Sequence, residues 1–252
     1  MKKAAKKIIC MLSAICVAVS MLIVCDTPVL AATAPAKVHI GLKQTYSSNI
    51  EVKFSQGDYK IQNVKCSSKN LTYRVTYVSS TSSKRTYEKD KPWGYGQIGL
   101  YAKKKGTYTV TFDVVDKNMN VTSSHSVKVY ANKEVGVKKV TFAGKDATYG
   151  TGGIWPSGSG AFKVTMNKGY TLKSITMTTY NKSGKATLKK IKNGAKVTLG
   201  KYRYISEKTD TSYSNWWSAE LLAQTKFEIV YKDKYSGQMV TVYHYFYRLP
   251  QN

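Results

Sequence analysis

Hydrophobic and polar positions alternate with a period of two along most of the chain, and residues 106–130 show this most clearly. A period of two predicts a strand with one buried face. The turn-forming segment 116–120 separates two such strands, so we expect a long hairpin here. The apolar positions that alternate are Tyr108, Val110, Phe112, Val114, Val127 and Val129.

Further strand-like runs precede this hairpin, at residues 37–43, 49–54, 59–66, 71–78 and 98–102. Their number and spacing are typical of a β-sandwich. The second half repeats three local patterns in the same order, about 102 to 117 residues further on. Residues 139–142 resemble 37–40, residues 169–177 match 57–66, and Asp233-Lys234 matches Asp116-Lys117. The sequence therefore predicts a duplicated all-β domain, with copies at residues 37–132 and 133–252.

The second copy contains a segment that the first copy lacks. Residues 186–191 and 196–204 flank Asn193-Gly194, which is a strong signal for a tight hairpin turn. We expect these two runs to pair as the most basic hairpin of the chain. Its basic residues are Lys189, Lys190, Lys192, Lys196, Lys201 and Arg203.

The N-terminus reads as a secretory signal peptide over residues 1–31, followed by a linker at 32–36. A lysine-rich start precedes an apolar run at residues 8–24, and small residues near Ala31 suit a signal peptidase. Two alternatives are a retained membrane anchor and lipidation at Cys25. Cleavage predicts a secreted, extracellular protein, associated with the cell wall in one version of this hypothesis, and without a membrane span.

Composition narrows the class of protein. After cleavage, Cys66 is the only one of the 4 cysteines left, which excludes an intramolecular disulfide and a cysteine-based zinc site. An exported chain without disulfides is typical of Gram-positive bacteria. The mature part keeps 36 of the 40 Lys and Arg residues and 13 of the 14 acids, a net charge of about +23. Such a charge favours anionic partners, although lysines also simply keep sheet edges soluble.

The run Gly106-Thr107-Tyr108-Thr109-Val110, followed by Val114-Val115-Asp116, resembles the last two strands of PKD and other bacterial immunoglobulin-like domains. The resemblance implies two tandem immunoglobulin-like β-sandwich domains. It also implies that Tyr108, at the start of the penultimate strand, turns its hydroxyl back to the backbone at the corner between the sheets. The Trp-Asp-Phe-Gly-Asp-Gly-like segment of PKD domains is missing, so the resemblance is to the wider class.

The sequence offers little for catalysis. The 3 histidines are scattered, and neither His-Glu-x-x-His nor Gly-x-Ser-x-Gly occurs. The acids are too dispersed to nominate a pair for glycoside hydrolysis. The glycine-rich run 150–160 lacks the Gly-Lys-Ser/Thr ending of a phosphate loop. We therefore expect a protein that is not an enzyme and uses neither a metal nor another cofactor.

Two groups of residues remain as candidates for ligand binding. Aromatic rings stack on sugars, although a tryptophan in such a fold can equally be a core residue. The last strand places three tyrosines on one face and apolar residues on the other, so that one face is expected to pack on a neighbour or a ligand. The second group is the basic hairpin, which could bind an anionic polymer. The aromatic candidates are Trp93, Tyr95, Trp155, Trp216 and Trp217.

These observations favour a secreted surface protein for binding or adhesion, whose lysine-rich strands engage an anionic polysaccharide, cell-wall polymer or host glycan. Motifs for specific nucleic-acid readout are absent. One alternative is a carbohydrate-binding module that uses exposed tryptophan or tyrosine. Another is a structural spacer in a surface assembly, which leaves a protein partner open.

Overall fold

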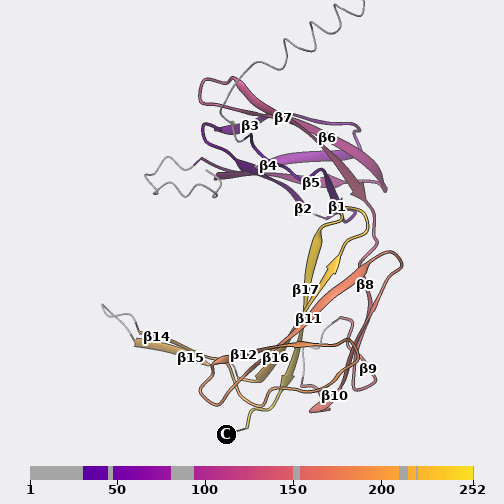
Figure 1. Cartoon of the computed structure of the whole chain (residues 1–252), viewed down its shortest axis with the longest axis vertical. Helices are drawn as coiled ribbons and strands as arrows, with labels where there is room; N and C mark the ends of the chain where they lie inside the picture. Colours follow the sequence, from indigo (N-terminus) through magenta and orange to yellow (C-terminus); the bar gives the residue numbers. More distant parts are fainter. Residues whose placement is uncertain are drawn as a thin grey trace, which may run out of the picture.

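The computed structural model describes residues 31–44, 48–80, 94–149, 154–209, 215–219 and 221–251, and only the backbone of residues 48–49, 77–80, 206–209 and 215–219. Every regular element in this part of the chain is a β-strand, which confirms the all-β prediction (Figure 1). None of these described residues forms a helix long and apolar enough to cross a membrane. The predicted signal peptide lies outside them, except for Ala31.

The first part of the chain forms two sheets that enclose one core. In the four-stranded sheet, β1 pairs in parallel with β7, while the β7–β6 and β6–β3 pairs are antiparallel. In the three-stranded sheet, β5 lies between β2 and β4, and both pairs are antiparallel. The strands are β1 (Lys37–Ile40), β2 (Ser48–Phe54), β3 (Lys60–Cys66), β4 (Leu71–Ser80), β5 (Gly94–Ala102), β6 (Gly106–Val115) and β7 (Val121–Ala131). We call this unit the first sandwich.

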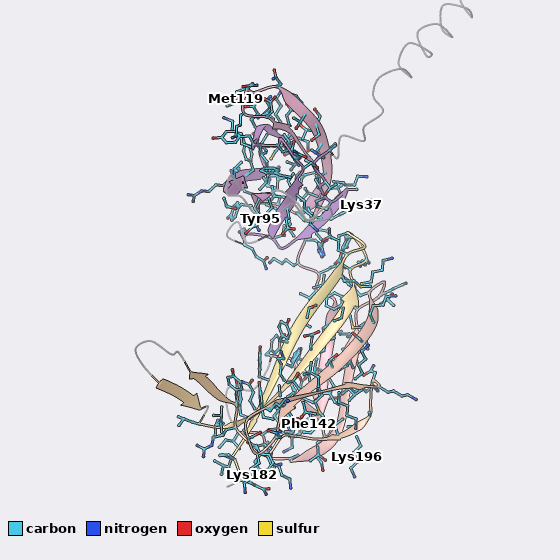
Figure 2. The ribbon with its side chains drawn as sticks, turned by 60° about the vertical axis from the view of Figure 1, so that its left-hand side comes forward. Lys37, Tyr95, Met119, Phe142, Lys182 and Lys196 are labelled. Atoms are coloured by element: carbon cyan, nitrogen blue, oxygen red, sulfur yellow. The ribbon has the colours of Figure 1, made fainter. Side chains whose placement is uncertain are left out.

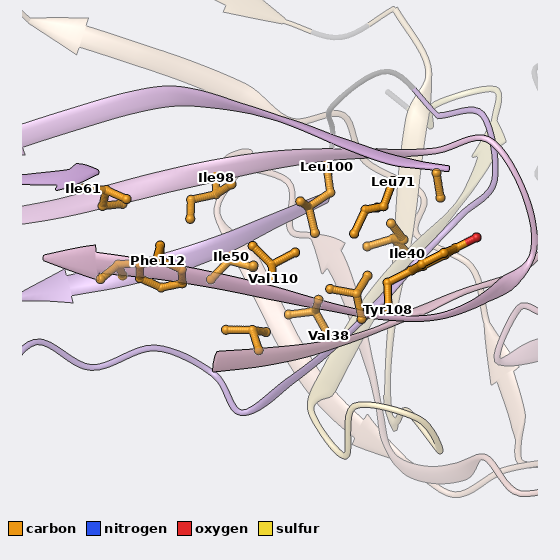
Figure 3. Close-up of a cluster of buried hydrophobic side chains, with 14 of the residues drawn as sticks. Val38, Ile40, Ile50, Ile61, Leu71, Ile98, Leu100, Tyr108, Val110 and Phe112 are labelled. Atoms are coloured by element: carbon orange, nitrogen blue, oxygen red, sulfur yellow. The ribbon is translucent and has the colours of Figure 1, made fainter. Parts of the chain in front are cut away.

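The apolar side chains at alternate positions of residues 106–130 help to fill this core. Tyr108, Val110 and Phe112 of β6 point between the two sheets, toward Ile98 and Leu100 of β5 (Figure 3). Each fully buried side chain of this size stabilises the fold by about 1.5–3 kcal/mol. The expected hairpin therefore contributes many of the side chains of the first core.

Tyr108 lies at the beginning of β6, and its hydroxyl donates a hydrogen bond to the carbonyl oxygen of Lys104 over 2.8 Å. The ring is 8% exposed, and its oxygen points away from the core (Figure 3). A tyrosine that bonds to the backbone a few residues upstream of the penultimate strand is a feature of immunoglobulin-like sandwiches.

The rest of the chain forms a second pair of sheets around its own core, which we call the second sandwich. The rings of Phe162 and Phe227 join the two sheets, stacked with centroids 3.9 Å apart. One sheet has the order β12-β11-β16-β17, the other β13-β10-β8-β9, and β14 and β15 form a separate pair. The strands are β8 (Val137–Phe142), β9 (Lys145–Asp146), β10 (Ser159–Met166), β11 (Thr171–Tyr180), β12 (Ala186–Ile191), β13 (Lys196–Thr198), β14 (Ile205–Thr209), β15 (Asn215–Ala219), β16 (Ala223–Lys232) and β17 (Met239–Arg248).

The hairpin expected around Asn193-Gly194 is wrong. β12 pairs with β11, whereas β13 pairs with β10 of the opposite sheet. The Asn193 side chain bridges the crossing, because its amide bonds both the N–H of Val164 (2.7 Å) and its carbonyl (2.9 Å). Gly194 adds a backbone bond to the carbonyl of Phe162. The turn therefore leads the chain from one sheet to the other.

Strand pairing supports two of the three sequence matches between the halves. β3 and β11 both follow a glycine with positive φ (Gly57 and Gly169), and the β6–β7 and β16–β17 hairpins turn at Asp116 and Asp233. The third match differs, because β1 pairs in parallel with β7 while β8 pairs antiparallel with β10. In the second sandwich, the parallel contact to the last strand comes from Ile154 instead. The domain boundary at residue 132 stays a prediction.

One cluster of polar residues connects the two sandwiches, and we call it the junction: His39, Asn132, Glu134, Asp233 and Tyr235. Nδ1 of His39 lies 2.8 Å from Oδ2 of Asp233, and Nε2 lies 3.0 Å from Oδ1 of Asn132. That same Oδ1 accepts the backbone N–H of Glu134 over 2.8 Å, which fixes the orientation of the amide. Both neighbours of the ring are therefore acceptors. The His39 ring therefore links Asp233 of the second sandwich to Asn132, which follows the last strand of the first.

Aromatic and charged contacts surround the His39 ring. The ring of Tyr235 lies 4.6 Å from that of His39, and its hydroxyl donates to Glu134 over 2.8 Å. Lys234 forms an ion pair with Glu134 as well. Burial raises the pKa of Asp233, but hydrogen bonds from Ser236 and His39 outweigh it and hold the pKa below its usual value. A cleft of about 560 Å³ lies beside the junction.

Candidate binding surface

The six basic residues of the expected hairpin are all exposed, although they do not form a hairpin. Lys189 and Lys190 lie on β12, Lys192 lies in the crossing turn, and Lys196 lies on β13. Lys201 and Arg203 follow in the segment before β14. The crossing turn therefore spreads this charge over the edges of two sheets. We call the six residues the basic edge.

The basic edge is free of competing carboxylates along the sequence, since no Asp or Glu occurs between Asp146 and Glu207. β12 is the outermost strand of its sheet, and its residues 186–190 are exposed on both faces. Lys182 and Lys196 mark this region in Figure 2, at the end of the second sandwich away from Lys37. Lysines on an unpaired edge prevent it from pairing with other strands, and they also present a positive surface.

The aromatic candidates differ in the exposure of their side chains. Trp155 is wrong as a ligand-binding residue, because it is only 6% exposed and its ring packs edge-on against Phe246. Its backbone N–H bonds the carbonyl of Tyr247, which turns the indole inward. Tyr95 of β5 is 40% exposed in the first sandwich, far along the chain from the basic edge. Trp93 lies outside the described residues, and only the backbone of Trp216 and Trp217 is described, in β15.

The most exposed aromatic row of the second sandwich was absent from the candidate list. Tyr243, Tyr245 and Tyr247 occupy every second position of β17 on its outward face, and we call them the tyrosine ladder. The opposite face, with His244 and Phe246, is buried. The alternation of β17 predicted the two faces, but it did not reveal which one would be covered.

The strand register places polar side chains beside the tyrosine ladder. On the outward face, Tyr243 pairs with Glu228 and then Thr176, and Tyr245 pairs with Lys226 and then Thr178. The same rows continue onto β12 at Lys190 and Leu188. The ammonium of Lys226 lies 5.3 Å from the centre of the Tyr243 ring. Of the basic edge, Lys190 therefore lies on the sheet face that carries the ladder, three strands away from Tyr243.

Among the described residues, the titratable groups outside this face include one histidine with a serine beside it. Oγ of Ser123 lies 3.0 Å from Nε2 of His125, and burial lowers the pKa of this histidine. A nucleophile–base pair also needs a third group to orient the base. In the described residues, Asp58 bonds Thr122 and Asp113 bonds Asn63 and Ser124, and these bonds hold the pKa of Asp113 low. Nor do any three His, Cys, Asp or Glu side chains of this part of the chain gather as a metal site.

Comparison with known proteins gives no family assignment. No family model matches the chain, and no curated protein matches it. Three solved structures are similar over most of the chain: the YadV chaperone (10% identity, 86% of this chain and 100% of that one, TM-score 0.30), the sialic acid binding region of a Streptococcus sanguinis SK1 adhesin (9%, 90% and 79%, 0.29), and the adhesin InvE of Yersinia pseudotuberculosis (10%, 85% and 58%, 0.22). TM-scores of this size establish neither a shared fold nor a shared activity.

Proposed function

We propose that the chain is a secreted, non-enzymatic surface protein of two immunoglobulin-like sandwiches, which binds an anionic cell-wall or host glycan polymer through its basic edge. The order β2-β5-β4 against β1-β7-β6-β3 supports the immunoglobulin-like assignment, because it places the strands as in the B-E-D and C-F-G sheets of that fold. Secretion rests on the lysine-rich, then apolar N-terminus.

The observation that carries this proposal is the basic edge itself. Its six cationic side chains are exposed, and the sequence around them contains no carboxylate that could neutralise them by local pairing. A positive surface of this kind attracts a polyanion over a distance of about 8 Å at physiological salt. Solubility alone needs charge, but it does not need charge of one sign gathered at one end of a molecule.

The test compares two variants of equal charge. In the first, Lys189, Lys190, Lys192 and Lys196 become Gln; in the matched control, the exposed Lys53, Lys69, Lys103 and Lys117 of the first sandwich become Gln. We expect binding to purified cell wall at low salt to fall at least tenfold in the first variant only, and to fade for the wild type at high salt. Equal losses in both variants would point to net charge rather than a site. Absence of wild-type binding at low salt would contradict the proposal and favour a spacer.

A further inference from the structure

The tyrosine ladder lies outside the core of the second sandwich. The core beneath β17 is filled from the other face by Val242, His244 and Phe246. Tyr243 and Tyr245 remain 51% and 38% exposed, and their cross-strand neighbours are Glu228 and Lys226 rather than apolar side chains. Exposed aromatic area that folding does not use is characteristic of a surface for binding.

The chemistry around the ladder selects the kind of ligand. Two tyrosine rings with centroids 6.5 Å apart offer π faces to the C–H side of a sugar ring. The neighbouring side chains can bond the hydroxyl groups of a sugar. Lys226 donates hydrogen bonds, Glu228 accepts them, and the Thr176 hydroxyl does both. A polyphosphate chain has charges but no apolar face, so it would leave the rings unused.

The positive charge on the same sheet face narrows the class of sugar further. The row from Tyr243 runs through Glu228 and Thr176 to Lys190 on β12, whereas Thr178 in the neighbouring row is buried. Four neighbouring strands span roughly 14 Å, since adjacent strands lie about 4.8 Å apart. A short sugar chain that crosses the strands along the Tyr243 row would therefore reach from the ladder to Lys190, where the basic edge begins.

We propose that the tyrosine ladder is the sugar-stacking part of a binding site for an acidic polysaccharide, and that the basic edge binds the acidic groups of the same chain. This inference rests on the proposed function and names its ligand class: sugars that carry carboxylate or sulfate groups. The rings recognise the sugar, and the lysines recognise its charge. Loss of the rings should therefore affect sugars alone, and loss of the lysines should affect every polyanion.

The experiment measures the affinity of the purified protein for alginate oligosaccharides and for inorganic polyphosphate, both at low salt. The variant is Tyr243→Thr with Tyr245→Thr, since threonine keeps the preference for a strand. The matched control is Tyr73→Thr, because Tyr73 lies on β4 of the first sandwich and is 42% exposed. Thermal unfolding shows that each variant keeps its fold.

We expect the double variant to lose alginate affinity by about 2- to 10-fold per ring and to bind polyphosphate as the wild type does. The control should bind both probes normally. Equal binding of alginate by the wild type and the folded double variant would overturn the ladder proposal while the proposed function stands. A wild type that binds neither probe would overturn both. A concentration-dependent dimer that the double variant abolishes would also overturn it, because the ladder would then cover a second copy.

Discussion

At the scale of single residues, a substitution at Tyr108 tests whether its hydrogen bond to the Lys104 carbonyl, the corner bond, stabilises the fold. Changing Tyr108 to Phe removes the hydroxyl that bonds the Lys104 carbonyl and keeps the buried ring. A hydrogen bond of this kind contributes about 0.5–1.5 kcal/mol, so the free energy of unfolding should fall by that amount and the urea midpoint should fall with it. Tyr73→Phe is the control, since that side chain is 42% exposed. Equal midpoints for wild type and Tyr108→Phe would show that the corner bond contributes nothing.

His244 gives a residue-scale prediction about pH. Burial lowers its pKa below the ordinary 6.5, while its bond to the Ala147 carbonyl raises it by less. The unfolded chain then binds a proton more readily than the folded one, so that stability falls as pH drops below about 6.5 and levels off below the folded pKa. His125 acts with the same sign, because burial lowers its pKa too.

The measurement is the urea midpoint from about pH 7.5 to pH 5. His244→Gln should flatten part of the decline, and the combination with His125→Gln should flatten more of it. A decline of unchanged steepness in the double variant would mean that other groups cause it.

At the scale of elements, the Asn193 turn replaces an expected hairpin. Asn193→Ala removes the two bonds between its amide and the Val164 backbone and leaves buried backbone groups unpaired. We expect a loss of about 1–3 kcal/mol, measured by urea unfolding. Asn118→Ala, in the exposed turn after β6, should cost far less. If both changes cost the same, the crossing does not depend on the amide.

The contrast between these turns shows what could be predicted from the sequence. The β6–β7 hairpin was predictable, because its residues bury one face along two strands of the same sheet. Asn193-Gly194 has the right local chemistry for a hairpin, but the amide finds partners on β10, which is distant in sequence. Turn propensity is a local property, whereas the choice of sheet depends on contacts across the core.

One part of the candidate site could be predicted from the sequence, and another part could not. Exposure of the basic edge follows from lysine's preference for water, and it was predictable. Trp155 was assigned to a ligand, yet it is buried, because a backbone bond to Tyr247 turns it toward Phe142 and Phe246. The tyrosine ladder was visible as a pattern, but only the packing of the second sandwich showed that it faces outward.

At the scale of the whole molecule, the junction joins residues of the two sandwiches, and we expect it to hold them together. His39→Phe keeps a ring beside Tyr235 but removes both bonds, to Asp233 and to Asn132. We expect NMR relaxation to show the wild type tumbling as a unit and the variant as two units on a tether.

A His39→Phe variant whose two sandwiches still tumble together would contradict this role of the junction. The sequence could not predict this contact, because its members are distributed over residues 39 to 235.

The parallel pairing of β1 with β7 has a mechanical consequence. Their register runs from Lys37 beside Lys128 to Ile40 beside Ala131. A force that stretches the chain from its ends pulls β1 and β7 past each other along their length. All the bonds between them then carry the load together, instead of opening one after another as in a hairpin pulled from its open end. We therefore expect the first sandwich to unfold slowly under tension. Under a stretching force, the unfolding rate determines how long the folded state lasts.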